Sequence, residues 1–393
     1  MKILIASDLY WPVINGVSTF SRTLAQGLAA RGHEVIVIAP SQTGKIYKEV
    51  DGNYTIVRTK SVPFLLYQKL RVSITPSREV KKIMNEFNPD VIHIQTLLMI
   101  GQAVMKYGCK MGIPIVSTNH AMPQNLIDNL KMLAPMARPI SYMLKRYGVR
   151  FHAKVDYITM PTQSAIDIFS VNVKKMSVPI EAVSNGIDLS RYTVGPRSLD
   201  IMKKFKIPTD CPIIEYVGRV DAEKHLPVLI MAFSRIIAEK EAHLLIVGSG
   251  VEIEKLREMA YEMGISKHVT FSGRVSDQDL IDLHKVGTVF CMPSPAELQS
   301  IATLEAMASG QPVVAVDAGP LKELCQNKRN GYLCEQDNDK EIAKALLKII
   351  SDPDLRESMS KESIAIAATH DLQKTLKRFE KIYTDLIKAR TVL

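Results

Sequence analysis

The fold is decided by the stretch Glu297-Leu-Gln-Ser-Ile-Ala-Thr-Leu-Glu305-Ala-Met-Ala-Ser-Gly310. An apolar run of strand length, 288–292, precedes this stretch, and a second run, 312–316, follows it. Between the two runs, apolar residues recur at 301, 304 and 307, which predicts a helix that begins near Ser300 and ends at Gly310. We therefore predict a strand–loop–helix–strand unit in which two glutamates bracket the N-terminus of the helix.

The two glutamates suit a phosphorylated sugar. A helix N-terminus has unpaired N–H groups and a partial positive charge, which favour a phosphate. Glu297 and Glu305 can flank such a phosphate and accept hydrogen bonds from sugar hydroxyls. The alternative is a helix whose glutamates are only solvated, but Glu305 lies between Leu304 and Ala306 in a segment with almost no other charge, and a charge there needs a partner.

Length and composition indicate a globular protein of two domains. Its 393 residues are enough for two ordinary domains, and 46% of them are hydrophobic. No apolar run approaches the ~20 residues of a membrane span, and residues 1–8 resemble a buried first strand rather than a signal peptide. The five cysteines form no Cys-x-x-Cys pair, so we expect reduced core thiols in a cytoplasm.

The positive charge of the chain is concentrated in its N-terminal part. The formal net charge is +9; residues 1–165 carry 20 Lys and Arg against 9 Asp and Glu, whereas the remainder carries 30 against 32. This asymmetry indicates a polyanionic partner for the N-terminal part, either nucleic acid or an anionic membrane surface.

Short apolar runs alternate with helical segments throughout the chain. We predict N-terminal strands near 1–8, 34–40, 55–59, 89–94, 114–118 and 153–161, with helices over 16–31, 76–88 and 101–112. Further strands are predicted at 213–217, 243–247 and 269–275, and a last helix over 372–390. Apolar strands of this length separated by helices are typical of parallel, doubly wound sheets.

Two residues of the N-terminal part stand where such sheets bind ligands. Gly16 lies at a loop-to-helix junction, where the lack of a Cβ lets backbone amides approach a phosphate or sugar. A plain turn glycine is the alternative. His120 follows the strand 114–118, and a structural histidine is the alternative there.

A pair of cations follows the first strand of the C-terminal part. In Gly218-Arg219-Val-Asp-Ala-Glu-Lys224 the Arg and the Lys flank a strand-to-helix loop, so both can converge on a diphosphate. The alternative is two solvated surface cations. We do not expect Arg219, Lys224 or Glu297 to pack in a core.

Residues 121–154 are basic and apolar at once. Six Lys and Arg face a single acid, Asp128, and apolar residues lie between them. Pro135 and Pro139 predict two short helices. Basic amphipathic helices suit the headgroup region of an anionic bilayer, which gives Lys131, Arg138, Lys145, Arg146 and Arg150 as predicted membrane contacts. The alternative is a helix packed on its own domain with a solvated basic face. No nucleic acid is expected, because no nucleic-acid motif is present.

These motifs together resemble a known family. Glu-x7-Glu followed by Ala-Met-Ala-x-Gly-x-Pro-Val-Val resembles the donor-site motif of retaining nucleotide-sugar glycosyltransferases of family GT4, although that family usually reads Glu-Gly-Phe-Gly where this chain has Glu-Leu-Gln-Ser. Gly218-Arg219-x4-Lys224 resembles the diphosphate motif of the family, and residues 183–188 resemble the turn that begins its second domain.

The resemblance implies a GT-B fold, with two Rossmann-like, doubly wound domains facing across a cleft. An acceptor-binding domain is expected over 1–180, a nucleotide-sugar-binding domain over 181–370, and a C-terminal helix over 371–393 that packs back on the first domain. The implied reaction is transfer of a hexose from a nucleotide diphosphate sugar with retention of configuration.

The resemblance also implies residue roles. Arg219, Lys224 and the helix N-terminus stabilise charge on the departing diphosphate, Glu305 holds the ribose, Glu297 the donor sugar, and His120 orients that sugar. The expected catalytic residues are His120, Arg219, Lys224 and Glu297. The expected donor-binding residues are Gly16, Gly218, Arg219, Lys224, Arg274, Glu297, Gln299, Ser300, Ile301 and Glu305. Neither a metal nor another cofactor is expected, because the protein cations can do the electrostatic work of a metal.

The acceptor follows from a narrower similarity. Residues 295–305 and 119–125 are similar to bacterial diacylglycerol α-glucosyltransferases, which implies UDP-glucose as donor, a lipid such as diacylglycerol as acceptor, and a cytoplasmic protein bound at the inner face of the cell membrane. Alternatives are a mannosyltransferase for an inositol lipid or a polysaccharide, a transferase with a soluble acceptor, a non-catalytic subunit of the same fold and a nucleotide-sugar epimerase.

Overall fold

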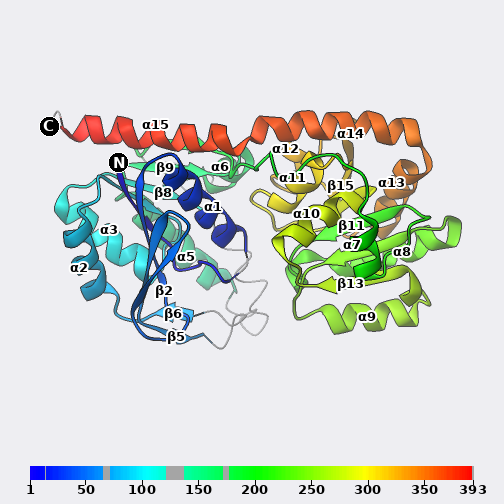
Figure 1. The fold of residues 1–393 in the computed structure, drawn as a ribbon, viewed down its shortest axis with the longest axis horizontal. Coiled ribbons are helices and arrows are strands. Elements are labelled where there is room, and N and C mark those ends of the chain that lie inside the picture. The colour runs from blue at the N-terminus through cyan, green and yellow to red at the C-terminus, as the bar shows by residue number, and fades with distance from the viewer. Residues whose placement is uncertain (14, 65–70, 121–136, 171–176, 392–393) are drawn as a thin grey trace. The chain divides into compact units, whose positions relative to one another are not determined.

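The computed structural model describes residues 1–13, 15–64, 71–120, 137–170 and 177–391 (Figure 1). The described chain divides into two compact units. The first holds the described residues up to Asn185 together with residues 374–391, and the second is Gly186–Gln373.

The first unit is built on a sheet of eight strands among the described residues, in the order β10-β9-β8-β7-β1-β2-β4-β3. The strands of the sheet are β1 (Lys2–Ala6), β2 (Glu34–Pro40), β3 (Tyr47–Asp51), β4 (Tyr54–Thr59), β7 (Val91–Ile94), β8 (Ile115–Thr118), β9 (Tyr157–Met160) and β10 (Ile180–Ala182). A separate hairpin joins β5 (Ser61–Pro63) to β6 (Arg71–Ser73).

This sheet departs from the expected parallel arrangement at one edge. β3 pairs antiparallel with β4, whereas the other neighbours in the sheet are parallel. The two strands are joined by a two-residue turn that includes Gly52 at a φ of +60°, a conformation that favours glycine. β3 alternates between exposed and partly exposed residues, so it lacked the apolar run by which β1, β2, β4, β7, β8 and β9 were predicted. The short β10 was not predicted either.

The helices expected over 16–31, 76–88, 101–112 and 372–390 are present within two residues of these bounds, and a further helix at 163–170 was not predicted. The described helices of the first unit are α1 (Gly16–Ala30), α2 (Ser77–Phe87), α3 (Met99–Met111), α5 (Ala137–His152) and α6 (Gln163–Ser170), and α15 (Leu372–Thr391) joins them from Lys374 onward. One expectation is wrong: Pro139 does not break a helix but lies in the first turn of α5. Proline is tolerated there because the N–H groups of a first turn have no intrahelical partner. Pro135 lies outside the described residues.

Helix α15 is held on the first unit by ion pairs and a buried tyrosine. Arg378 pairs with both oxygens of Glu181, and Glu380 accepts two hydrogen bonds of 2.8 Å from Arg31. The Tyr383 hydroxyl is buried and lies 2.6 Å from Nδ1 of His93. The end of the chain therefore completes the core of the unit that contains its beginning.

The second unit is built on a parallel sheet of six strands among the described residues, in the order β13-β12-β11-β14-β15-β16. The strands are β11 (Ile213–Val217), β12 (His243–Val247), β13 (Val269–Gly273), β14 (Val289–Met292), β15 (Val313–Val316) and β16 (Gly331–Cys334). Strands β11, β12, β14 and β15 are buried along their whole length, as expected for a sheet covered on both faces.

Helices and short 3₁₀ segments precede, connect and follow these strands (Figure 1). The α-helices are α7 (Leu199–Phe205), α8 (Leu226–Glu239), α9 (Ile253–Glu262), α10 (Asp277–Val286), α11 (Ile301–Ala308), α12 (Leu321–Leu324), α13 (Asp339–Ser351) and α14 (Pro353–Ala367). The 3₁₀ segments are η2 (Ala222–Lys224), η3 (Ser266–His268) and η4 (Ala368–His370).

The cysteines follow the expectation with one exception. All five are free thiols, and four of them are buried in the second unit. Cys109 of α3 is exposed instead, because the helix turns this position away from the sheet.

Candidate active site

The candidate site of the second unit lies where the order of its sheet reverses. Strands β11 and β14 are neighbours, and the sheet grows outward from this pair in opposite directions. In such sheets ligands bind outside the carboxyl ends of the strands at this point. Arg219 follows β11 and Glu297 follows β14, so the fold brings the two predicted motifs to the same edge.

An ion pair joins the two loops at this edge. Nζ of Lys224 lies 2.5 Å from Oε1 of Glu297, and the two side chains are only 12% and 13% exposed. Lys224 is also 4.0 Å from Oε1 of Glu223. The structure therefore brings the cation predicted for the diphosphate into contact with the carboxylate predicted for the sugar.

Arg219 is fixed by two buried carboxylates. It pairs with Oδ2 of Asp221 at 2.5 Å and with Oε1 of Glu223, whose side chains are 3% and 2% exposed. The expectation that Arg219, Lys224 and Glu297 avoid the core is thus wrong, because most of each side chain is buried. Carboxylates at such depth need a cation beside them, and the arginine supplies it.

The backbone of the loop after β11 is held close to the next loop of the sheet. Gly218 donates its N–H to the carbonyl of Val247, and the Tyr216 hydroxyl donates to the carbonyl of Arg219 at 2.7 Å. A Cβ on Gly248 would lie 1.8 Å from the carbonyl oxygen of Gly218. Glycine is therefore required at 248 for the two loops to approach, and the approach fixes the position of Arg219.

Helix α11 begins directly after the loop that carries Glu297. Ser300 is its N-cap and accepts hydrogen bonds from the N–H of Thr303 at 3.3 Å and from its hydroxyl at 2.8 Å. Gln299 is buried and lies 3.4 Å from His370, and Ile301 is partly exposed. The positive end of the helix dipole thus follows the loop whose Glu297 contacts Lys224.

Glu305 lies in the second turn of α11 and is held by two partners. Its Oε2 is 3.5 Å from Nε2 of His284, and Tyr192 hydrogen-bonds to its carboxylate. His284 in turn contacts Glu215 of β11 at 3.0 Å. Sequence reasoning missed Glu215 and His284. The available signal was a carboxylate inside the apolar run Ile213-Ile-Glu-Tyr-Val217, since a charge in a buried strand needs a partner.

Three further predicted site residues lie on other elements. Arg274 is exposed after β13, two strands away from β11 in the sheet. Gly16 and His120 belong to the first unit. Gly16 is the first residue of α1, capped by Asn15, and a Cβ there would meet no atom within 4 Å. Packing within the described chain therefore gives no steric reason for glycine at this position.

His120 follows β8 at the carboxyl edge of the first sheet. Its Nε2 donates to Oε1 of Gln95 at 2.9 Å, and its ring lies 5.1 Å from that of Phe20. Burial lowers the pKa of His120 to about 3, so the ring is neutral at physiological pH. A neutral ring can orient a ligand by hydrogen bonding.

Three Asp-x-Asp sequences have structural partners at helix N-termini. Asp277 and Asp279 lie in the first turn of α10, and Asp279 pairs with Lys204 at 2.7 Å. Asp339 of the second sequence, 337–339, pairs with Arg235. Asp352 of the third sequence, 352–354, caps α14. Carboxylates are favoured at these positions by the helix dipole.

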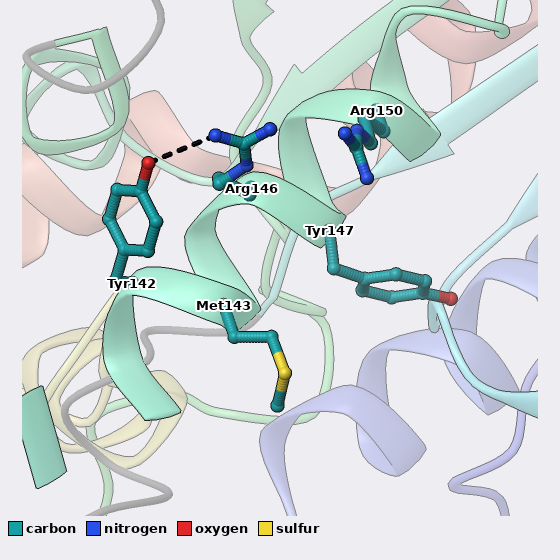
Figure 2. A pocket seen from close by; sticks show the side chains of 5 residues that line it. All are labelled: Tyr142, Met143, Arg146, Tyr147 and Arg150. Carbon is teal, nitrogen blue, oxygen red and sulfur yellow. Dashed lines mark hydrogen bonds between the residues drawn. The ribbon is translucent and has the colours of Figure 1, made fainter. Parts of the chain in front are cut away.

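The predicted membrane segment is described in part. Lys131 lies outside the described residues, and the side chains of Arg138 and Lys145 are not described. Arg146 and Arg150 are exposed on α5, together with Tyr142 and Met143, which are 62% and 63% exposed. These four residues and Tyr147 line a hollow of about 410 Å³ (Figure 2). In this hollow Arg146 donates to the Tyr142 hydroxyl at 3.0 Å.

A second hollow of about 460 Å³ continues from the first toward α3. Tyr147 and Arg150 line both hollows. The other residues of the second hollow are Gln102, Met105, Lys106, Cys109, Phe151 and Lys154. Exposed cations and apolar side chains thus share one face of the first unit. None of the helices in the described part of the chain has the length and apolar character that a membrane span requires.

Both units match families of known proteins. Residues 198–365 match the family described as Glycosyl transferases group 1, and residues 14–191 match Glycosyltransferase Family 4. The alpha-monoglucosyldiacylglycerol synthase of Streptococcus pneumoniae is 26% identical over 397 residues, covering 98% of this chain and 86% of the relative. A GDP-mannose-dependent alpha-mannosyltransferase of Mycolicibacterium smegmatis is 26% identical over 341 residues, covering 86% and 85%.

Solved structures with a similar fold cover nearly the whole chain. Sucrose-phosphate synthase from Thermosynechococcus elongatus superposes with a TM-score of 0.81 at 18% identity, covering 99% of each chain. Anabaena HepE in complex with UDP-glucose superposes with a TM-score of 0.75 at 18% identity, covering 98% of this chain and all of that one.

Proposed function

Because the chain belongs to the family 4 glycosyltransferases, we propose that it transfers glucose from UDP-glucose to diacylglycerol or a related membrane lipid with retention of configuration. The GT-B fold expected from the sequence is confirmed by the similar solved structures. In this proposal the second unit binds the donor, and the first unit binds the acceptor and the membrane.

The contact between Lys224 and Glu297 carries the proposal. It places a cation and a carboxylate 2.5 Å apart at the carboxyl edge of a doubly wound sheet, where such sheets bind ligands. Departure of a nucleoside diphosphate leaves negative charge on phosphate oxygens, and preorganised cations lower the free energy of that state. Lys224, Arg219 and the N-terminus of α11 supply the positive charge, and Glu297 accepts hydrogen bonds from the sugar.

The proposed donor is supported by a solved structure of the same fold and by the positive charge of the candidate site. The structure of Anabaena HepE, which shares this fold, contains UDP-glucose. The two cations and the helix dipole do the work that a divalent metal does in other nucleotide-sugar enzymes. We therefore propose a reaction without a metal. His120, which is neutral, orients the sugar rather than transferring a proton.

The acceptor proposal is supported by the S. pneumoniae relative and by the basic face of α5. The name of that relative states a product in which glucose is attached to diacylglycerol. Each Lys or Arg close to an anionic membrane surface contributes about 1 kcal/mol. The exposed Arg146, Arg150, Lys106 and Lys154 thus favour peripheral binding to the anionic inner face of the cell membrane, with Tyr142 and Met143 inserted shallowly.

A mannosyltransferase is the second candidate, because the M. smegmatis relative is named for GDP-mannose. The test is incubation of the full chain with UDP-glucose or GDP-mannose and vesicles that contain diacylglycerol or phosphatidylinositol. Products are identified by mass spectrometry, and the anomeric coupling is read by NMR. We expect α-glucosyl diacylglycerol from UDP-glucose, in the presence of a chelator.

Each other outcome points to a different function. Mannosylation of phosphatidylinositol would establish the second candidate, and a β-linked product would contradict retention. Conversion of the nucleotide sugar without any acceptor would indicate an epimerase. The variant Glu297→Gln is the control for background transfer.

A further inference from the structure

A histidine is enclosed between two carboxylates in the second unit. His284 of α10 is fully buried. Its Nδ1 lies 3.0 Å from Oε2 of Glu215, in the middle of β11, and its Nε2 lies 3.5 Å from Oε2 of Glu305, on α11. His284 thus links Glu215, in the core of the sheet, to Glu305, which we propose to contact the donor.

The ring of His284 carries a proton at neutral pH. Burial lowers the pKa of a histidine. For His243 of the same unit, burial and the nearby charge of His268 lower the pKa to about 4. At His284 burial acts in the same direction, but the carboxylates of Glu215 and Glu305 outweigh it and raise the pKa to about 10. An imidazolium has an N–H on each nitrogen, so it can donate a hydrogen bond to Glu215 through Nδ1 and face Glu305 through Nε2 as an ion pair.

The polar groups around His284 hold this arrangement in place. Gln311, which follows α11, donates to Oε2 of Glu215 at 2.5 Å and to the carbonyl of His284 at 2.8 Å. Tyr192 presents its ring edge-on to His284 at 5.7 Å and hydrogen-bonds to Glu305. Burial and the Glu305 carboxylate raise the pKa of Tyr192 far above its ordinary value, so its hydroxyl keeps its proton. Glu305 is therefore approached by two donors from outside α11.

We infer that His284 is a positioning residue, which fixes the Glu305 carboxylate in the orientation that binds the nucleoside of the donor. The inference rests on the proposed function, because it takes Glu305 as the group that contacts the nucleotide. Without the imidazolium, two carboxylates would face each other in a buried space with no cation between them. The carboxylate of Glu305 would then turn away toward solvent, and its hydrogen bonds would no longer be preorganised.

The test is a double-mutant cycle read by binding of UDP to the full chain in calorimetry. We expect His284→Gln to weaken binding of UDP by about tenfold, which corresponds to about 1.4 kcal/mol. If His284 acts through Glu305, it adds nothing in a chain that already carries Glu305→Gln, so the two effects are not additive. In transfer assays His284→Gln should raise KM for the nucleotide sugar more than it lowers kcat.

The matched control is His243→Gln. His243 is also buried in the second unit, but its Nε2 contacts the hydroxyl of Thr270 at 2.8 Å and no carboxylate. This variant should bind UDP normally. Glu215→Gln provides a second test if His284→Gln does not fold, because it keeps the shape of the side chain and removes one of the two charges that hold the ring. It should weaken UDP binding in the same direction.

The charge of the His284 ring can also be measured directly in the unsubstituted chain. In ¹⁵N-histidine-labelled protein at pH 8, the ring nitrogens of His284 should show imidazolium shifts, whereas those of His243 show a neutral ring. Additive effects of the two substitutions, or normal UDP binding by His284→Gln, would overturn the inference while the donor site stands. If Glu305→Gln itself binds UDP normally, both the inference and the proposed role of Glu305 are wrong.

Discussion

The buried polar groups beside the two candidate ligand edges differ in charge. In the first unit His93 lies 2.6 Å from the hydroxyls of Tyr383 and Thr118, and His120 contacts the amide of Gln95. Burial lowers the pKa of both rings to about 3, so both are neutral. In the second unit the corresponding groups are ions: Lys224 with Glu297, and His284 between Glu215 and Glu305.

The difference shows that the partners of a buried histidine, rather than its depth, set its charge. Hydroxyl and amide partners leave the desolvation of the ring uncompensated, whereas two carboxylates reverse it. It also matches the ligands that we propose for the two units. A donor diphosphate is highly charged and needs fixed ions, whereas a sugar ring and a diacylglycerol hydroxyl are neutral and need only hydrogen bonds.

The largest expected effect is loss of stability when Arg219 is removed. Arg219→Ala leaves the carboxylates of Asp221 and Glu223 buried without this cation, which costs about 3–5 kcal/mol for a buried ion pair. Chemical denaturation of the full chain measures the change. The control is Arg235→Ala, which breaks the pair with Asp339 at a side chain that is 47% exposed. That pair should contribute less than about 1 kcal/mol, and equal losses would show that the Arg219 cluster is not a buried charge network.

The next effect is on catalysis. Lys224→Ala and Glu297→Gln should each lower kcat by at least about 100-fold, the scale of removing one preorganised charge contact. Lys204→Ala is the control, since Lys204 is a cation of the same unit with 56% of its side chain exposed. Steady-state transfer from UDP-glucose measures the three variants. Near-normal rates for both site variants would mean that the ions of the second unit do not face the diphosphate.

The fold was predicted from the sequence wherever apolar periodicity was strong. Helix α11 begins and ends where Ser300 and Gly310 predicted, and β14 and β15 flank it. Strand β3 could not be predicted, because an edge strand with one partner needs no apolar run. The position of Pro139 in the first turn of α5 depended on where that helix begins, which local sequence does not specify.

The motifs predicted which residues form the candidate site. They did not predict that these side chains are buried or which buried groups pair with them. Spacing and strand order are enough to bring Arg219, Lys224 and Glu297 to one edge of a sheet. No motif marks Asp221 and Glu223, the buried carboxylates that pair with Arg219. Glu215 and His284 are 69 residues apart in sequence, so their contact exists only once β11 and α10 have packed.

Membrane binding tests whether the first unit uses the charge on its surface. Arg146→Ser with Arg150→Ser removes two exposed cations, each of which contributes about 1 kcal/mol at an anionic surface. Binding to vesicles that contain phosphatidylglycerol should weaken by about 30-fold in sedimentation assays. The wild-type chain should lose its binding at 1 M salt, where the Debye length is ~3 Å. Equal binding of the wild type to neutral and anionic vesicles would assign α5 a solvated basic face instead.

The pH dependence of stability is a further expected effect, and it has opposite signs at His93 of the first unit and His284 of the second. His93 has a pKa of about 3 when folded and about 6.5 when unfolded, so the unfolded chain binds more protons between these values. Its contribution to stability is therefore complete above pH 6.5 and is lost as the pH falls. His284, with a pKa of about 10, is the reverse: its contribution is complete below pH 6.5 and is lost as the pH rises to 10.

Two substitutions separate the acid and the alkaline side of the curve of Tm against pH. His93→Gln should flatten the fall of Tm on the acid side, and His284→Gln the fall on the alkaline side. Each flattening should amount to at least about 2–4 °C, the shift that 1 kcal/mol produces in a domain of about 150–250 residues. Scanning calorimetry between pH 5 and 10 measures both. If His284→Gln changed the acid side of the curve instead, the His284 ring would be neutral in the folded protein. The difference in charge between His93 and His284 would then be wrong.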